Sequence, residues 1–259
     1  MSRIVYVNGE FVAEENAVIS VFDRGFLFAD AVYEVSSVLE GKLIDNPAHI
    51  KRLHRSLGEL NIASPATDNE ILGIQRELIK RNNLHEGAIY LQVSRGSADR
   101  DFPFPANIKP SLVMFSQEKE IIDSPHARNG INVISVPDIR WKRRDIKTVG
   151  LLAQVLAKQA AIDAGAVDAW MVEDGFVTEG SSNNAFIVDA DGKLITRHLG
   201  NEILHGITRA SVIEMIEKEN IVFEERAFTL DEAKNASEAF ITSATTLVWP
   251  VVDLSLIHI

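Results

Sequence analysis

The chain has 259 residues, 46% of them hydrophobic and 24% charged, which is ordinary for a globular protein of one large or two smaller domains. A formal net charge of -11 argues against nucleic-acid binding, because contacts with phosphates require a basic surface. The sequence contains no cysteine, which excludes disulfide bonds and thiolate metal sites, and it begins with no apolar segment of signal or membrane-span length. We therefore expect a soluble, cytoplasmic protein that binds neither nucleic acid nor membranes.

The first 117 residues combine strand and helix patterns. Asn8-Gly9 and Glu40-Gly41, each flanked by strand-forming residues, predict hairpin turns. Apolar residues at helical spacing predict helices over 47–60 and 68–81, and the stretches "AIYLQVSRG" and "PSLVMFS" predict core strands. We expect residues 1–117 to form an N-terminal α+β domain.

A charged and irregular stretch, "QEKEIIDSPHARNG", follows and predicts a linker over residues 118–130. Beyond it, the strand pattern "INVISV", a helix pattern over 149–164, hairpin turns at two Asp-Gly pairs and a capping box from Thr229 to Glu232 predict a C-terminal domain over 131–253. Because strands outnumber helices and recur as hairpins, we expect two α+β domains rather than a doubly wound parallel sheet.

The last six residues, "LSLIHI", read as the translation of a common sequencing adapter, and we interpret residues 254–259 as an artificial tail. The alternative interpretation is a natural apolar edge strand. Neither interpretation assigns these residues a function.

The motifs of several common enzyme classes are missing. The seven histidines show no zinc-ligand spacing, so we expect no metal site. No G-x-S-x-G motif of a serine hydrolase occurs. The glycine-serine turns "RGSAD" and "EGSSNN" are neither phosphate loops nor dinucleotide fingerprints.

Lys147 stands between a cationic stretch, "WKRR", and a helix pattern rich in leucine and alanine, "TVGLLAQVLAKQAAIDAG". Desolvation at a helix built for the interior and the like charges nearby disfavour an ammonium group at this position. An uncharged lysine amine is what Schiff-base chemistry needs. The alternative is a lysine that extends to solvent at the start of a helix.

Three further features point to a phosphorylated ring cofactor. Glu179, in "VTEGSSNNAF", is either an ordinary charge at the end of a strand or the acid that keeps a cofactor ring nitrogen protonated. The other two features are stretches with N–H or hydroxyl groups that can bind a phosphate: Gly206, Ile207 and Thr208 at the start of a helix, and Ser243, Ala244 and Thr245 in a turn after a strand. Capping by Thr208 and a plain polar turn are the simpler alternatives for these two.

Taken together, these motifs resemble the fold type IV pyridoxal phosphate enzymes, most closely the bacterial D-amino acid aminotransferases. The resemblance is carried by "DRGFLFADAVYEV", "HIKRL", "DIRWKRRDIKTVGLLAQVLAKQ", "VTEGSSNNAF", "LHGITR" and "FITSATTLVWPV", and it spans nearly all of the chain. It implies a smaller N-terminal α/β sandwich domain, a larger C-terminal β-barrel-like domain with helices, pyridoxal 5'-phosphate as cofactor, and a homodimer with the active site at its interface.

The resemblance also implies roles for individual residues around the cofactor. Lys147 matches the family's Schiff-base lysine, and Glu179 matches the partner of the pyridine nitrogen. Arg52 in "HIKRL" matches an arginine that pairs with the cofactor phosphate, a role that suits a permanently charged guanidinium. Leu204 matches a residue packed against the ring, and Ser182 a hydroxyl near it. Ile207 and Thr208 match the phosphate donors at the helix start.

On the substrate side, Tyr33 and Arg100 match residues that orient the donor carboxylate in the D-specific group, where the partner subunit contributes the arginine. The D-specific pattern Arg-x-His is replaced here by Arg100-Asp101-Phe102, and Phe102 cannot donate a hydrogen bond to a carboxylate. Ala244 replaces a threonine that would help to bind the phosphate. These departures put the donor range in question.

The expected activity is transfer of an amino group from a D-amino acid such as D-alanine to a 2-oxo acid such as 2-oxoglutarate or pyruvate, by a ping-pong mechanism. Three alternatives remain open at this point: an (R)-selective amine transaminase, a branched-chain L-amino acid aminotransferase, and an inactive protein that only binds the cofactor.

Overall fold

The computed structural model describes residues 2–256 and divides into two compact units. The N-terminal unit extends to Glu120 and also contains Ile146–Gly150, and the C-terminal unit contains Ile121–Asp145 and everything from Leu151 onward. None of the helices within residues 2–256 is both long and apolar enough to cross a membrane.

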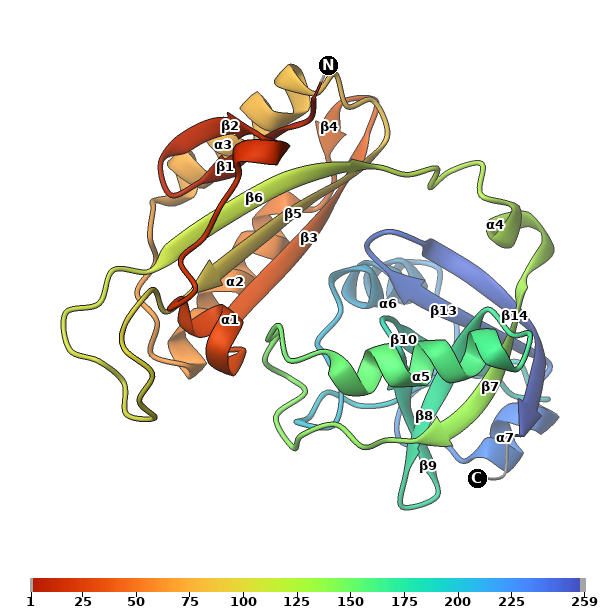
Figure 1. The fold of residues 1–259 in the computed structure, drawn as a ribbon. Helices are drawn as coiled ribbons and strands as arrows, with labels where there is room; N and C mark the ends of the chain where they lie inside the picture. The colour runs from red at the N-terminus through yellow and green to blue at the C-terminus, as the bar shows by residue number, and fades with distance from the viewer. Residues whose placement is uncertain (1, 257–259) are drawn as a thin grey trace. The chain divides into compact units, whose positions relative to one another are not determined.

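The N-terminal unit is a six-stranded sheet with helices on one face (Figure 1). The strands run in the order β2-β1-β6-β5-β3-β4. The elements, in chain order, are β1 (Ile4–Val7), β2 (Glu10–Ala13), the 3-10 helix η1 (Glu14–Asn16), α1 (Arg24–Phe28), β3 (Ala31–Leu39), β4 (Lys42–Leu43), α2 (Asn46–Glu59), α3 (Asp68–Arg81), β5 (Gly87–Ser94) and β6 (Ser111–Glu118).

Local sequence signals explain most of this unit. Both predicted hairpins are confirmed, since Val7 pairs with Glu10 and Leu39 pairs with Lys42. Asn8 and Glu40 adopt the left-handed conformation that such tight turns require. Helix α3 begins after a capping box between Thr67 and Glu70. Apolar side chains of α2 and α3, such as Leu53, pack on the sheet and form its core.

Residues 146–150 join the N-terminal unit, although the sequence patterns assigned them to the C-terminal domain. The backbone explains the difference, because this segment pairs with the start of β3. Tyr33 N–H donates to Lys147 O at 3.0 Å, and Val149 N–H donates to Ala31 O at 3.2 Å. The chain therefore leaves the C-terminal unit for five residues and returns at Leu151.

The C-terminal unit is built on an eight-stranded mixed sheet in the order β12-β11-β10-β13-β14-β7-β8-β9. Its elements are α4 (Pro125–Asn129), β7 (Ile131–Pro137), α5 (Leu152–Asp163), β8 (Asp168–Glu173), β9 (Phe176–Gly180), β10 (Asn184–Val188), β11 (Leu194–Thr196), α6 (Ile207–Lys218), β12 (Phe223–Glu225), α7 (Leu230–Asn235), β13 (Glu238–Ser243) and β14 (Leu247–Leu256). The expected α+β fold class is confirmed. The predicted capping box between Thr229 and Glu232 starts α7, whereas α4 lies in the stretch that was expected to be a linker.

One expectation about this unit needs correction. Helix α5 was expected to be interior, but only Ala157 and Ala161 of it are buried, and Leu152 is 72% exposed. Residues 254–256, part of the stretch interpreted as an artificial tail, continue β14 and pair there with β7, and the interpretation of residues 254–259 as a tail stays a prediction. Residues 257–259 lie outside the described part of the chain.

Candidate active site

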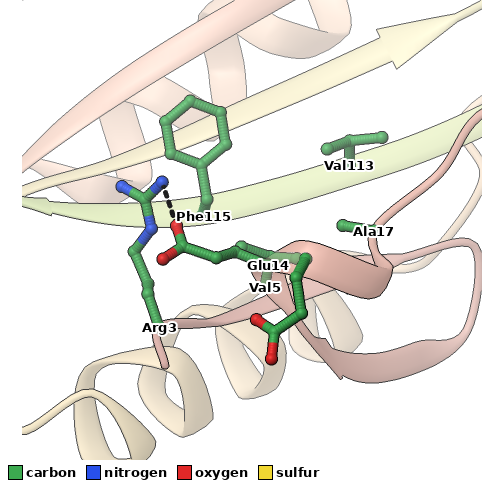
Figure 2. Close-up of a pocket in the computed structure, with 7 residues that line it drawn as sticks. Arg3, Val5, Glu14, Ala17, Val113 and Phe115 are labelled. Carbon is green, nitrogen blue, oxygen red and sulfur yellow. Dashed lines mark ion pairs between the residues drawn. The ribbon is translucent and has the colours of Figure 1, made fainter. Parts of the chain in front are cut away.

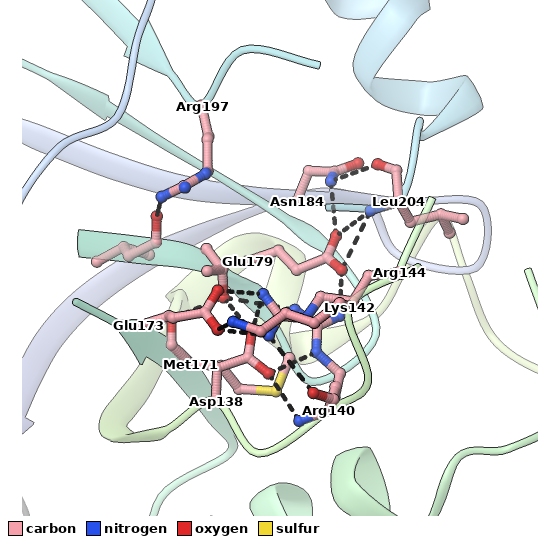
Figure 3. Close-up of polar contacts among 12 residues, drawn as sticks. Asp138, Arg140, Lys142, Arg144, Met171, Glu173, Glu179, Asn184, Arg197 and Leu204 are labelled. Atoms are coloured by element: carbon pink, nitrogen blue, oxygen red, sulfur yellow. Dashed lines mark hydrogen bonds and ion pairs between the residues drawn. The ribbon is translucent and has the colours of Figure 1, made fainter. Parts of the chain in front are cut away.

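A buried carboxylate, Glu179, lies near the end of β9 with only 4% of the residue exposed (Figure 3). Leu204 N–H donates to both of its oxygens, at 3.2 and 3.1 Å, and Asn184 Nδ2 donates to Oε2 at 2.9 Å. Arg140 Nη1 donates to Oε1. Burial raises the pKa of Glu179, and the Arg140 guanidinium opposes that rise.

Arg140 connects Glu179 to a second buried carboxylate. Its Nε and Nη2 donate to the two oxygens of Asp138 at 2.9 and 2.6 Å, a bidentate geometry that fixes the guanidinium plane. Thr178 Oγ1 also donates to Asp138, at 2.6 Å. The network continues outward, with opposite charges alternating, through three residues: Arg144, Glu173 and Lys142.

Sequence reasoning missed Arg140. The signal for it is the pair Asp138 and Arg140 directly after a buried strand, where residues two apart lie on the same side of an extended chain. The charge argument made for Lys147 was wrong in one respect, because the neighbouring cations are paired within the C-terminal unit. Lys142 and Arg144 bind Glu173.

Lys147 lies in the N-terminal unit beside Tyr33. Its Nζ stands 4.1 Å from the centroid of the Tyr33 ring, and in residues 2–256 it has no hydrogen-bond or ion-pair partner. The backbone fixes the position of the residue, since Lys147 O accepts from Tyr33 N–H and Lys147 N–H donates to Ser56 Oγ at 3.4 Å. The charge of Lys147 also helps to lower the pKa of the nearby Glu34 carboxylate. A lysine amine held over a ring face can act as a nucleophile when it is unprotonated.

Arg52, predicted to bind a phosphate, forms a bidentate pair with Glu34 in the same unit. Arg52 Nε and Nη2 donate to the two Glu34 oxygens at 2.8 and 2.7 Å, and His49 Nδ1 lies 2.8 Å from Glu34 Oε2. Burial favours the neutral acid, but the charge of Arg52 and its hydrogen bonds lower the pKa of Glu34 to about 2. The pair orients the guanidinium, and a phosphate contact from Arg52 stays a prediction.

Arg100 is exposed and lies beside two aromatic rings. Its guanidinium carbon lies 5.4 Å from the Phe28 ring centroid and 5.7 Å from that of Phe102. Phe102 is 75% exposed, and its carbonyl and that of Asp101 accept from Arg24. The structure therefore brings Arg100 and Phe102 together on one loop, with the Phe102 ring open to solvent.

Helix α6 begins at Ile207, with Gly206 at its N-cap and no side-chain cap. The simpler alternative, in which the Thr208 side chain caps the helix, is therefore wrong. The first N–H groups of a helix have no partner within it, so Ile207 and Thr208 leave donors at this end. The start of α6 lies close to the Glu179 cluster, because a Cβ placed on Gly206 would stand 2.0 Å from Asn184 Oδ1.

The remaining predicted residues lie on two turns of the C-terminal unit and in the segment before α6. Ser243 ends β13, and its hydroxyl is 2.8 Å from that of Thr246 in the turn that also contains Ala244 and Thr245. Ser182 is exposed in the turn that follows Glu179. Leu204 contacts Glu179 through its backbone N–H. Within the described chain, no group of three or more histidine or acidic side chains is placed to hold a metal ion.

A surface pocket of about 310 Å³ lies elsewhere on the N-terminal unit, beside β1 and β6 (Figure 2). Arg3 and Glu14 in its wall pair with each other at 2.7 Å. None of the predicted site residues lines it, so the pocket is separate from the residues considered above.

Known proteins resemble the chain over nearly its whole length. The profile of the family described as amino-transferase class IV matches residues 31–254. A D-alanine aminotransferase of Staphylococcus aureus is 40% identical over 96% of this chain and 88% of its own length, and one of Bacillus licheniformis is 36% identical with the same coverage.

Solved structures give the same fold. A branched-chain amino acid aminotransferase of Escherichia coli, 21% identical, superposes with a TM-score of 0.90 over 98% of this chain and 87% of its own. The fold is therefore that of the fold type IV enzymes, as expected. From the profile match and the identity to curated relatives, the chain belongs to the class IV aminotransferases, which use pyridoxal 5'-phosphate.

Proposed function

We propose that this enzyme transfers the amino group of a D-amino acid, with D-alanine as the reference donor, to a 2-oxo acid such as 2-oxoglutarate or pyruvate. The observation that carries the proposal is the 40% identity, over 96% of the chain, to an enzyme whose name states this donor. The match of Tyr33 and Arg100 to residues that orient a donor carboxylate in the D-specific group supports it.

The C-terminal unit has three features that fit the cofactor. Glu179 is a buried carboxylate whose oxygens accept from Arg140, Asn184 and Leu204, and a carboxylate fixed in this way is the acid partner that a ring N–H needs. The unpaired N–H groups at the start of α6 suit a phosphate. Thr242 Oγ1, which is buried and has no hydrogen-bond partner in the described chain, stands at the end of β13 beside the Ser243 turn.

Each predicted residue then has a defined task. When bound, the cofactor supplies an electron sink for the carbon that bears the amino group. Lys147 Nζ would hold the cofactor between turnovers and, once released, remove the proton from the donor Cα as a general base. Glu179 would keep a proton on the ring nitrogen. Arg100 and Tyr33 would orient the donor carboxylate.

The remaining cofactor contacts are proposed for the phosphate and the ring. Those for the phosphate are Arg52, Gly206, Ile207, Thr208, Ser243, Ala244 and Thr245, and those for the ring are Leu204 and Ser182. Three of the phosphate contacts use only backbone N–H groups, at Gly206, Ile207 and Ala244, so their loss is not tested by side-chain truncation. Substitution of Thr208 or Arg52 addresses the phosphate end directly.

A second candidate activity is favoured by one observation. Phe102 offers an exposed apolar ring where a hydrogen-bond donor would complete a carboxylate clamp. That ring suits an amine without a carboxylate, as in an (R)-selective amine transaminase. A branched-chain L-amino acid activity ranks lower, because the related structures with that name are 21–26% identical, below the D-alanine enzymes.

The visible absorption spectrum of the purified enzyme tests the donor class. We expect D-alanine to bleach the band of the bound cofactor within one turnover, while L-leucine at the same concentration leaves it unchanged. A chiral arylalkyl amine is the third donor. Bleaching by the amine alone would replace the proposal with the amine transaminase, bleaching by L-leucine alone would replace it with the branched-chain enzyme, and a band that no donor changes would indicate an inactive binder.

We also propose that the active form is a homodimer, in which Arg100 serves the partner's site. Apolar side chains that a monomer leaves in water support an interface: Val18, Val21, Phe22, Phe26 and Phe104 in the N-terminal unit, and Leu152, Val155 and Leu156 on α5. Sedimentation equilibrium should give twice the 28.6 kDa of one chain. A monomer that is fully active would contradict the proposal.

A further inference from the structure

The side chain of Asn184 joins three parts of the C-terminal unit. Asn184 is the first residue of β10 and is 4% exposed. Its Nδ2 donates to Glu179 Oε2 at 2.9 Å and to Leu204 O at 3.0 Å. Both partners are acceptors, so the nitrogen, and not the oxygen, of the amide must face them. The amide therefore has a single orientation in this network.

The amide oxygen points the other way and touches Gly206. A Cβ placed on Gly206 would stand 2.0 Å from Asn184 Oδ1, far inside any real contact distance. The Gly206 backbone, with φ of -66° and ψ of 136°, is accessible to every residue type. The space taken by Asn184, and not the backbone conformation, is thus what requires glycine at the N-cap of α6.

The three groups form a closed ring of hydrogen bonds. Leu204 N–H donates to Glu179, Leu204 O accepts from Asn184, and Asn184 donates to Glu179. Leu204 precedes the N-cap Gly206 by two residues. The ring therefore fixes the Glu179 carboxylate at a set distance from the first N–H groups of α6.

We propose that Asn184 is a positioning residue that, through Leu204 and Gly206, sets the spacing between the ring-nitrogen partner Glu179 and the phosphate donors at the start of α6. This inference rests on the proposed cofactor site and adds a function for a residue that makes no contact of its own with the reaction. A rigid ligand has a ring nitrogen at one end and a phosphate at the other. Both ends contribute to its binding affinity only when the protein keeps Glu179 and the phosphate donors at the matching distance.

The test compares two ligands, pyridoxal phosphate and pyridoxal, by equilibrium binding to the full-length cofactor-free chain. The quantity of interest is the dissociation constant of pyridoxal divided by that of pyridoxal phosphate. This ratio measures how much the phosphate adds to the affinity once the ring is bound. In Asn184→Asp, a carboxylate would face Glu179 and the bond to Leu204 O would be lost. We expect the ratio to fall by about tenfold, the size of one charge-assisted hydrogen bond.

Asn183→Asp is the matched control, because it makes the same chemical change next to a different buried carboxylate. Asn183 Nδ2 donates to Asp168, and within the described residues its side chain has no hydrogen bond to Glu179 or Leu204. This control should keep the wild-type ratio. An unchanged ratio in Asn184→Asp, whether both ligands weaken equally or neither does, would overturn the proposal.

Gly206→Ala provides a second, independent variant if Asn184→Asp does not fold. The added methyl group would collide with Asn184 Oδ1, so the ratio should fall, and Asn184→Ala in the same chain should not lower it further. If the two substitutions lowered the ratio additively, Gly206 and Asn184 would act independently, which would contradict the contact between them. Failure of the wild-type chain to bind pyridoxal phosphate at all would instead refute the proposed cofactor site, which keeps the two failures distinct.

Discussion

Replacing Lys147 with alanine should abolish transamination with every donor. The loss combines the attachment point of the cofactor with the general base, and the general base alone typically contributes about 10²–10⁴-fold. The fold should survive, because the contact of Nζ with the Tyr33 ring is worth about 0.5–2 kcal/mol, and Glu34, with which Lys147 also interacts, keeps its bidentate pair with Arg52. Steady-state rates with D-alanine and an unfolding curve measure the two effects separately.

Two controls make the result specific to the amine. Lys142→Ala removes a lysine five positions earlier that is 83% exposed in its side chain and pairs with Glu173, and it should keep wild-type rates. Lys147→Arg keeps a cation over the Tyr33 ring and should be as inactive as the alanine variant. Borohydride reduction followed by peptide mass analysis should find the cofactor on the Lys147 peptide of the wild-type chain. Residual turnover near the wild-type rate in either Lys147 variant would refute the assignment.

Sequence patterns predicted the elements of this fold well where the signal is local. The hairpin at Asn8-Gly9 and the helix α3 have the predicted positions, because turn residues and capping boxes act within a few residues. Helix α5 begins at Leu152, three residues later than expected, because residues 146–149 pair with β3 instead of continuing a helix. That pairing joins segments more than a hundred residues apart and leaves no local pattern.

The same distinction applies to the site. Lys147 and Glu179 stand in motifs that could be singled out from the sequence, whereas Arg140 and Asn184 could not. Arg140 lies among other cations, and only its bidentate contact with Asp138 and its contact with Glu179 distinguish it. Asn184 is one of two consecutive asparagines, and its partners come from β9 and from the segment before α6. Such roles follow from packing between distant segments.

Arg140 also carries the largest expected effect on stability. In Arg140→Leu, Glu179 and Asp138 both lose a buried cation, and breaking a buried pair by removing one partner costs about 3–5 kcal/mol. Asp138 retains Thr178 and Arg144, and Glu179 retains Leu204 and Asn184, so the chain should still fold. Denaturant unfolding of the cofactor-free chain measures the free energy of unfolding.

The loss should depend on pH in a definite direction. Burial already raises the pKa of Glu179, and without Arg140 the pKa rises further. When the pKa of a group is higher in the folded than in the unfolded chain, protonation of that group stabilises the fold. The stabilisation is complete below the unfolded pKa, near 4.5, and is lost as pH rises through the folded pKa. Arg140→Leu should therefore lose more stability relative to wild type at pH 8 than at pH 5.5.

A double variant identifies the group responsible for this pH dependence. Arg140→Leu with Glu179→Gln leaves no ionisable group at position 179, so it should recover part of the lost stability at pH 8 and show a weaker dependence on pH. Arg140→Lys keeps a cation but cannot bind Asp138 in a bidentate manner, and its loss should lie between wild type and the leucine variant. A loss in Arg140→Leu that is equal at both pH values, or larger at pH 5.5, would show that Arg140 stabilises the fold by packing alone. The charge of Glu179 would then have to be maintained by Leu204 and Asn184, which donate to the same carboxylate.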